Sequence, residues 1–270
     1  MTNAPHEPAQ EQSAKIDTTV PHSARIWNYW LGGKDNYEVD RVAGEQFREI
    51  FPEVADLART SRHFLARTVR YLAVEAGVRQ FLDIGAGLPT VDNTHEIAQR
   101  AAPESRIVYV DNDPLVLAHA HALLTGTAEG AVDFVDGDLH DPGRILEAAE
   151  KTLDLSRPVG LIFSGVLGHV AESDEVRAII SGVTGALSSG SYLSLNDGTV
   201  STDEAVKAQE QYNNSGALPY HLRTPQEIIA FFDGLELVEP GVVPIGRWRP
   251  EPSPFAPASG AAHGGVGRKP

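Results

Sequence analysis

The sequence predicts an α/β protein with a doubly wound, mostly parallel β-sheet that follows an N-terminal helical extension. Two observations predict the sheet. After Gly77, short apolar runs alternate with helical segments, and the runs at 80–84, 106–113 and 159–165 are almost wholly apolar. Strands of this composition are typical of a parallel sheet that helices cover on both faces. The third observation is the helical spacing of apolar residues before Gly77, which predicts the extension.

The extension, residues 21–77, is expected to contain three helices. In the first, Ile26, Tyr29 and Trp30 are spaced as on one helix face, and the two glycines that follow are a typical helix end. The same spacing continues twice more, each time up to a proline or glycine that stops it. The expected helices cover residues 22–33, 39–51 and about 54–76.

The sheet domain, residues 78–250, is expected to alternate strands with helices that begin at recognisable caps. An aspartate or threonine directly before a proline marks a helix start, because the side chain caps the helix and proline fits its first turn. Such starts occur at Asp113–Pro114, Asp141–Pro142 and Thr224–Pro225, and the spacings Ser201…Glu204 and Thr224…Glu227 are those of capping boxes. The other strands are expected at 131–138 and 191–197, with a hairpin-like pair at 235–248.

Both ends of the chain are expected to be tails. Residues 1–20 contain few large apolar groups, and residues 251–270 are dominated by proline, glycine and alanine. Neither segment offers enough apolar surface to offset the conformational entropy that is lost on ordering. We therefore predict a disordered N-terminal tail and a flexible C-terminal tail on one folded unit.

The composition restricts the classes of partner. The 270 residues include 22 basic and 37 acidic side chains, and the net charge of −15 disfavours nucleic acids and anionic membrane surfaces. The chain has no cysteine, so disulfides and thiolate metal sites are excluded, and we expect no metal. No signal peptide or membrane-spanning helix is recognisable. We expect a cytoplasmic protein that acts on a small molecule, while the oligomeric state stays open.

The segment QFLDIGAGLPT, residues 80–90, is expected to form a ligand-binding loop after the first strand. Its two glycines let the backbone approach a ligand closely. A dinucleotide-binding motif would need a third glycine, where this chain has Thr90. Asp83, before the first glycine, would repel a diphosphate and attract an ammonium group. These features favour S-adenosylmethionine, which has an ammonium and a sulfonium but no phosphate.

Further acids follow the next two strands. Asp111 ends the second strand, where a carboxylate can accept hydrogen bonds from both hydroxyls of a ribose. Asp138 ends the third strand, where it can accept from the amino group of adenine. Asp136 fits either a second adenine contact or a solvated turn. Because ligands bind beyond the carboxyl ends of parallel strands, these acids and the glycine loop together indicate a nucleoside site.

The motifs DIGAG, YVDND and DGDL, in this order, resemble those of class I S-adenosylmethionine-dependent methyltransferases. Longer segments, among them ARIWNYWLGGKDNYEVDR and VYVDNDPLVLAHAHALL, are similar to a bacterial family named S-adenosyl methyltransferase, formerly a domain of unknown function. The resemblance covers about residues 21–250. It implies a Rossmann-like class I methyltransferase fold with an antiparallel C-terminal strand pair, methyltransferase activity and S-adenosylmethionine as cofactor, but no particular substrate.

Carried over by position, the resemblance implies a set of site residues. The acids and the glycine loop would hold the cofactor, in a set made up of Asp83, Gly85, Ala86, Gly87, Asp111, Asn112, Asp138, Leu139 and Ser164. In class I methyltransferases an added N-terminal segment commonly covers the cofactor cleft. The expected lid and substrate residues are accordingly Lys34, Asp35, Asn36, Tyr37, His95 and Tyr220.

The catalytic residue is not determined by these motifs. His169 is the candidate, because it follows the fourth strand in SGVLGHV and small-molecule methyltransferases often have a similar VLxH segment there. Two alternatives to an active methyltransferase stay open. One is a regulatory protein that binds S-adenosylmethionine or S-adenosylhomocysteine without catalysis. The other is an NAD(P)-dependent oxidoreductase, which Asp83 and the missing third glycine disfavour.

Overall fold

The computed structural model describes residues 16–123, 125–251 and 260–270, and structural statements below refer to these residues. The N-terminal extension forms three helices, as expected. They are α2 (Ser23–Trp30), α3 (Glu38–Ile50) and α4 (Val54–Val74). α3 and α4 each bury an apolar face, which explains the spacing seen in the sequence, whereas α2 buries Ile26 together with Arg25 and Asn28.

The rest of the chain forms one mixed sheet of eight strands with helices on both faces. The strand order is β3-β2-β1-β4-β5-β8-β6, with β7 also paired to β8. The strands are β1 (Gln80–Ile84), β2 (Arg106–Asp111), β3 (Ala131–Asp136), β4 (Gly160–Ser164), β5 (Tyr192–Gly198), β6 (Glu236–Leu237), β7 (Val243–Pro244) and β8 (Ala262–Arg268). The helices are α5 (Thr94–Ala101), α6 (Pro114–Leu123), α7 (Pro142–Ala149), α8 (Ser173–Ala186), α9 (Asp203–Asn213) and α10 (Pro225–Ala230), with short 3-10 turns at Leu167–His169 and Ile245–Arg247.

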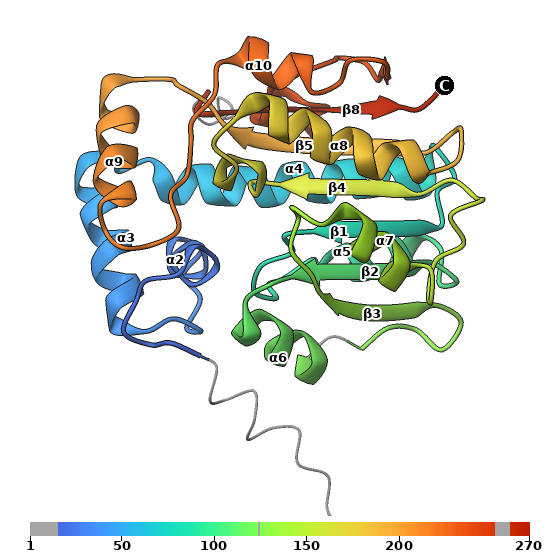
Figure 1. Ribbon diagram of the computed structural model, residues 1–270, viewed down its shortest axis with the longest axis horizontal. Helices are drawn as coiled ribbons and strands as arrows, with labels where there is room; N and C mark the ends of the chain where they lie inside the picture. The colour runs from blue at the N-terminus through green and yellow to red at the C-terminus, as the bar shows by residue number, and fades with distance from the viewer. Residues whose placement is uncertain (1–15, 124, 252–259) are drawn as a thin grey trace, which may run out of the picture.

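Alternate residues of the central strands pack on opposite faces of the sheet. Leu82 and Ile84 of β1, with Leu161 and Phe163 of β4, pack against α7, α8 and α10. Phe81 of β1 packs on the other face against α4 and α5. In Figure 1, α7 and α8 accordingly lie in front of the sheet, and α4 and α5 lie behind it. The predicted class I methyltransferase fold, with its covered parallel sheet, is confirmed.

Most predicted helix caps are also confirmed. The side chains of Asp113, Asp141 and Thr224 each accept a hydrogen bond from a backbone N–H in the first turn of α6, α7 and α10. The cap predicted at Ser201 is wrong by one residue, because the Thr202 hydroxyl accepts from the Ala205 N–H at 3.2 Å. The hydroxyls of Ser201 and Thr202 can both cap a helix. Thr202 is the cap because the helix begins at Asp203, the next residue.

The antiparallel C-terminal part is built from other residues than predicted. The segment 235–248 does not form a hairpin, because β6 and β7 each pair with β8. The other edge of β8 pairs with β5 along its whole length. The prediction of a flexible tail over 251–270 is therefore wrong for residues 260–270, while 252–259 lie outside the described residues.

The glycines of β8 explain why its composition was misleading. A Cβ at Gly264 would lie 2.6 Å from the Cβ of Asn196, and one at Gly267 would lie 2.9 Å from the Phe232 ring. At these two positions neighbouring atoms lie so close to the strand that a side chain does not fit. Main-chain hydrogen bonds and close packing order this segment, in place of the large apolar side chains that sequence reasoning looks for.

At the other end, residues 1–15 of the predicted tail lie outside the described residues. Residues 16–20 are attached to α2 through Arg25, whose guanidinium donates to the carbonyls of Asp17 at 3.0 Å and Val20 at 2.6 Å. The folded unit therefore begins before residue 21.

The parallel strands all end toward the same side of the molecule. In Figure 1 their arrowheads point toward α2, α3 and α9, which stand beyond this edge of the sheet. The described helices include none that is long and apolar enough to cross a bilayer.

Candidate active site

A cavity of about 370 Å³ lies where the carboxyl ends of the parallel strands meet the N-terminal helices. The loops after β1, β2, β3 and β4 form one side of it. α2, α3, α4 and α9 contribute the opposite walls. All nine residues predicted to hold the cofactor line this cavity: Asp83, Gly85, Ala86, Gly87, Asp111, Asn112, Asp138, Leu139 and Ser164.

The glycine loop after β1 has the backbone geometry that a closely bound ligand requires. Gly85 and Gly87 have φ values of 75° and 67°, which disfavour residues with a side chain. A Cβ at Gly85 would lie 2.6 Å from the Cβ of Val166, so the loop also packs tightly against the turn after β4. At Gly87 a Cβ would meet no heavy atom within 4 Å, so the side toward the cavity is open.

Asp111 connects this loop to the end of β2. One carboxylate oxygen accepts from the Gly87 N–H at 2.8 Å, and the other accepts from the Asp113 N–H at 3.0 Å. Burial raises the pKa of the Asp111 carboxyl, while these two hydrogen bonds lower it. Each oxygen has a second lone pair, and the group lines the cavity, so it can accept two further hydrogen bonds from a ligand.

Asp138 lies in the loop after β3 and not in the strand, which ends at Asp136. Its carboxylate accepts from the backbone N–H of His140 at 2.9 Å, and this hydrogen bond holds the pKa of Asp138 below its usual range. Asp136 is exposed and does not line the cavity, which fits the solvated turn. His140 lines the cavity beside Asp138, a position that sequence reasoning missed.

Asp83 is a buried carboxylate on the floor of the cavity. The Thr94 hydroxyl donates to it at 2.7 Å. Burial raises the pKa of Asp83 to about 6, although the Thr94 hydrogen bond and the charge of Arg62 lower it. A cationic group bound in the cavity would stabilise the ionised form of this residue.

His169 and Tyr220 also line the cavity, as expected. His169 Nδ1 lies 2.9 Å from the carbonyl oxygen of Pro219, which can only accept a hydrogen bond. Nδ1 is therefore protonated and, in the neutral ring, Nε2 has the free lone pair. Burial lowers the pKa of His169, so the neutral form dominates near pH 7. Its ring packs edge-to-face with Tyr220 at a centroid distance of 5.1 Å.

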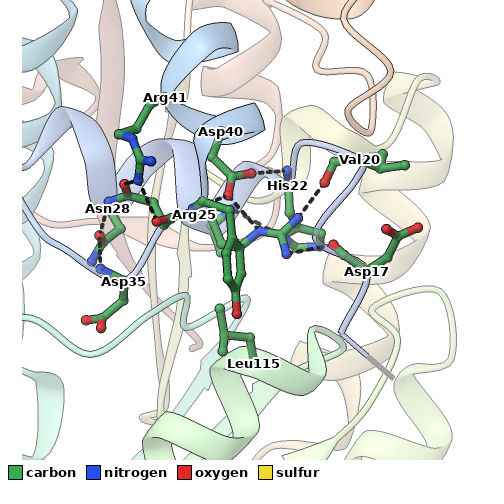
Figure 2. A network of polar contacts seen from close by, with 12 residues as sticks. Asp17, Val20, His22, Arg25, Asn28, Asp35, Asp40, Arg41 and Leu115 are labelled. Carbon is green, nitrogen blue, oxygen red and sulfur yellow. Dashed lines mark hydrogen bonds and ion pairs between the residues drawn. The ribbon is translucent and has the colours of Figure 1, made fainter. Parts of the chain in front are cut away.

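The other predicted lid residues, Lys34, Asp35, Asn36 and Tyr37, are not among the residues that line the cavity. The turn formed by Lys34, Asp35, Asn36 and Tyr37 folds back onto α2 instead. Its anchor is Asn28, whose Oδ1 accepts from the Asp35 N–H at 3.1 Å and from the Asn36 amide at 2.9 Å (Figure 2). Asn28 itself lines the cavity, so the turn supports a wall residue.

His95 is likewise absent from the cavity lining. It is buried against Tyr109, whose hydroxyl lies 2.8 Å from the His95 backbone nitrogen and 2.9 Å from Nδ1. Burial lowers the pKa of His95, which keeps the ring neutral. Its place is in the packing between α5 and β2.

A buried polar network holds the N-terminal segment in place (Figure 2). Arg25 forms an ion pair with Asp40 at 3.2 Å, and both side chains are almost fully buried. His22, before α2, lies with Nδ1 3.0 Å from the carboxylate of Asp113, which follows the end of β2. The same nitrogen lies 3.4 Å from the Ala24 N–H. It cannot donate and accept at once, and the shorter contact with the carboxylate is the stronger one.

His22 and Arg62 are two further polar cavity residues that sequence reasoning missed. Both come from the helical extension, before the first strand. The motifs mark strand ends, whereas helix residues reach the site only through tertiary packing. One sequence by itself contains no motif that identifies these two residues as part of the cavity.

The comparisons with known proteins agree with this geometry. A model of the S-adenosyl methyltransferase family matches residues 9–270. The chain belongs to this family. The predicted resemblance is thereby confirmed. Among curated proteins no match is found.

Two crystal structures are similar over almost the whole chain. A family protein from Streptomyces avermitilis, with the family name DUF574, is 43% identical, with 95% of this chain and 100% of that chain covered and a TM-score of 0.91. A proposed methyltransferase from Thermobifida fusca is 38% identical, with 97% and 98% covered and a TM-score of 0.87. The mitomycin 7-O-methyltransferase MmcR, 14% identical with a TM-score of 0.51 over 98% of this chain and 76% of that one, shares the fold alone.

Proposed function

We propose that this S-adenosyl methyltransferase family member transfers a methyl group from S-adenosylmethionine to a small, largely apolar acceptor. The observation that supports this most is the composition of the cavity lining. Nine residues from the ends of four strands line one side, and apolar and aromatic side chains of α2, α3, α4 and α9 line the rest of the same cavity. A binding protein without catalysis would need the first part only.

The cofactor side offers one group for each part of the nucleoside. Asp83 and the glycine loop suit the ammonium of the methionine end, and Asp111 with Asn112 suits the ribose. Asp138 and Leu139 provide a polar and an apolar contact for the adenine ring. Gly85 and Gly87 leave the backbone without side chains where the ligand would approach. The residues present therefore fit the cofactor that the family name implies.

The acceptor side is aromatic and uncharged. Trp30 packs on Phe47 with a centroid distance of 4.9 Å, and Phe47 contacts Tyr212 of α9 at 6.4 Å. All three line the cavity together with Trp27, Phe51 and Leu57. No charged side chain of α2, α3 or α9, each described in full, lines it. Such a wall favours a neutral ring or chain over a charged substrate.

The chemistry requires mainly alignment. S-adenosylmethionine supplies a methyl carbon that is already activated by its sulfonium. The walls of the cavity orient the acceptor and exclude water. We assign His169 the part of general base for a hydroxyl acceptor, because its ring lines the cavity with Nδ1 held by the Pro219 carbonyl.

The test is titration calorimetry with S-adenosylhomocysteine and NAD, on the wild type and on Asp111→Ala. We expect the wild type to bind S-adenosylhomocysteine and not NAD. Asp111→Ala should weaken this binding by about 1–3 kcal/mol, because the ribose loses a charged acceptor and the Gly87 N–H loses its partner.

The melting temperature of Asp111→Ala serves as the control for folding. Binding of NAD without binding of S-adenosylhomocysteine would overturn the proposal. An unchanged affinity in a folded Asp111→Ala protein would place the ribose elsewhere.

A further inference from the structure

Arg62 is a charged residue of the cavity that no motif identifies. It lies in the middle of α4 and reaches the cavity beside the glycine loop. Its Nη2 donates to the carbonyl of Asp92 at 3.0 Å. Its Nε is buried and has no hydrogen-bond partner among the described residues. A buried N–H without a hydrogen-bond acceptor is destabilising unless a ligand supplies the acceptor.

The surroundings of Arg62 are acidic, yet none of these acids pairs with it. Asp83, Asp92 and Glu96 each exert an electrostatic effect on the guanidinium. Within the described part of the chain, however, no carboxylate lies at ion-pair distance from Arg62, whereas Asp92 pairs with Arg100 at 2.8 Å. The charge is therefore held in the wall of the cavity without a counter-ion in direct contact.

Asp83 is an acidic residue of the same cavity that likewise has no ion-pair partner among the described residues. Its hydrogen-bond donor is the neutral Thr94 hydroxyl, and no cationic side chain of the described residues forms an ion pair with it. Arg62 is close enough to influence it electrostatically but does not contact it. One cation and one anion thus line the same part of the cavity, each without a contacting partner of opposite charge.

This pair of charges has the chemistry of a receptor for an α-amino acid. A zwitterion presents a carboxylate and an ammonium one carbon apart. Nε and an Nη of one guanidinium form a planar fork that matches the two oxygens of a carboxylate. Asp83 can accept from the ammonium.

We propose that Arg62 binds the α-carboxylate of the cofactor's methionine end, while Asp83 binds its ammonium group. This inference rests on the proposed function, since it assigns one end of the same ligand. Under this proposal a charged residue of the helical extension contacts the cofactor directly, in addition to the acids at the strand ends.

The same ligand series tests the proposal without any turnover. S-adenosylhomocysteine has the complete amino acid, its decarboxylated analogue lacks the carboxylate alone, and 5′-methylthioadenosine lacks the amino acid. Arg62→Met removes the guanidinium and keeps most of the apolar stem. We expect Arg62→Met to bind S-adenosylhomocysteine roughly 10–100-fold more weakly than the wild type, which is the effect of losing charged hydrogen bonds.

The two smaller ligands make the result specific. Arg62→Met should bind the decarboxylated analogue and 5′-methylthioadenosine within about twofold of the wild type, because neither has the group that Arg62 contacts. Arg62→Lys should recover part of the affinity for S-adenosylhomocysteine. Arg59→Met, on the same helix but exposed in an ion pair with Asp56, is the matched control and should change no affinity.

Two results would overturn the assignment. Either Arg62→Met binds S-adenosylhomocysteine as the wild type does, or it loses affinity for all three ligands equally, as a purely structural arginine holding the Asp92 loop would. If the wild type itself binds none of the three, the proposed function fails and this inference fails with it. If instead the wild type binds all three ligands, and Arg62→Met binds them with the same relative affinities as the wild type, this inference alone fails and the proposed function stands.

Discussion

Asp197, at the end of β5, is a buried acid that the proposed chemistry does not use. The Tyr220 hydroxyl donates to its Oδ1, while Oδ2 is buried without a hydrogen-bond partner among the described residues. Burial raises the pKa of Asp197 to about 7, although the charge of Arg223 lowers it. A carboxyl of this kind stabilises the fold while it is protonated. The stabilisation is complete below its pKa in the unfolded chain, near 3.8, and is lost as the pH rises through about 7.

Asp197→Asn should therefore become more stable than the wild type as the pH rises. At pH 5 the folded wild type buries a neutral carboxyl, and only part of its stabilisation is lost, so the two melting temperatures should differ least there. At pH 8 the wild type must bury a charge, which costs on the order of 4 kcal/mol. The side-chain amide of the variant has N–H groups without partners, which offset part of this difference. The variant should therefore be more stable than the wild type at pH 8 by about 1–3 kcal/mol, or roughly 3–10 °C in melting temperature.

Thermal melts at pH 5, 6.5 and 8 measure this effect. Glu210→Gln, which removes an exposed carboxyl, is the control and should show no such trend. A difference between Asp197→Asn and the wild type that is the same at every pH would show that Asp197 is ionised throughout.

The strand-end acids of the site could be located from the sequence, whereas the helix residues could not. Asp83, Asp111 and Asp138 follow consecutive strands, and the topology of a parallel sheet brings such positions to one edge. Arg62 belongs to a helix with several arginines of similar spacing, and only the packing of α4 decides which of them reaches the cavity. These arginines are Arg59, Arg62, Arg67 and Arg70.

At the scale of elements, the prediction succeeded wherever large apolar side chains follow a regular period. α2, α3, α4 and the five parallel strands all have this property. β8 does not, since four of its seven residues are glycine or alanine. It is nevertheless an interior strand, with β5 on one side and β6 and β7 on the other. Its stability comes from partners that are distant in sequence, which a local pattern does not reveal.

Gly264→Ala tests the close packing of this strand. A Cβ at Gly264 would lie 2.6 Å from the Leu195 carbonyl oxygen and from the Asn196 Cβ, and a backbone atom cannot move aside as a flexible side chain can. We expect a loss of about 1–3 kcal/mol of unfolding free energy, or roughly 3–10 °C in melting temperature.

The matched control is Gly185→Ala near the end of α8. A Cβ there would meet no heavy atom within 4 Å, so the variant should keep or slightly raise the melting temperature, as alanine favours a helix. A Gly264→Ala protein that melts with the wild type would show that β8 tolerates a wider spacing from β5.

At the scale of the whole molecule, the cavity separates two packed bodies. One is the sheet with its two layers of helices. The other is a helical cap formed by α2, α3 and α9, which has an apolar cluster of its own that includes Ile26, Phe47 and Tyr212. The His22–Asp113 contact of 3.0 Å connects the cap to the loop after β2. The lid that the sequence predicts in this region stays a prediction; the residues of this region that line the cavity belong to α2 and not to the turn after it.

If α2 covers the cofactor, ligand binding must reduce the opening of this cap. We expect S-adenosylhomocysteine to slow amide hydrogen exchange in residues 23–31 as well as in the glycine loop, because a molecule between the two bodies contacts both. Exchange in α8, which packs on one face of the sheet and contributes no residue to the cavity lining, should stay the same.

His22→Ala tests whether the His22–Asp113 contact contributes to the slower exchange of residues 23–31 in the presence of ligand. It removes the contact with Asp113 but keeps the Arg25–Asp40 pair that orders the cap internally. The variant should melt below the wild type by roughly 3–10 °C, because the Asp113 carboxylate is 5% exposed and loses the partner of a buried oxygen, which costs about 1–3 kcal/mol. With saturating ligand, exchange in residues 23–31 should be faster than in the wild type, while the glycine loop keeps its protection. Protection of the glycine loop alone in the wild type would mean that α2 does not cover the ligand, and that another part of the chain closes the site.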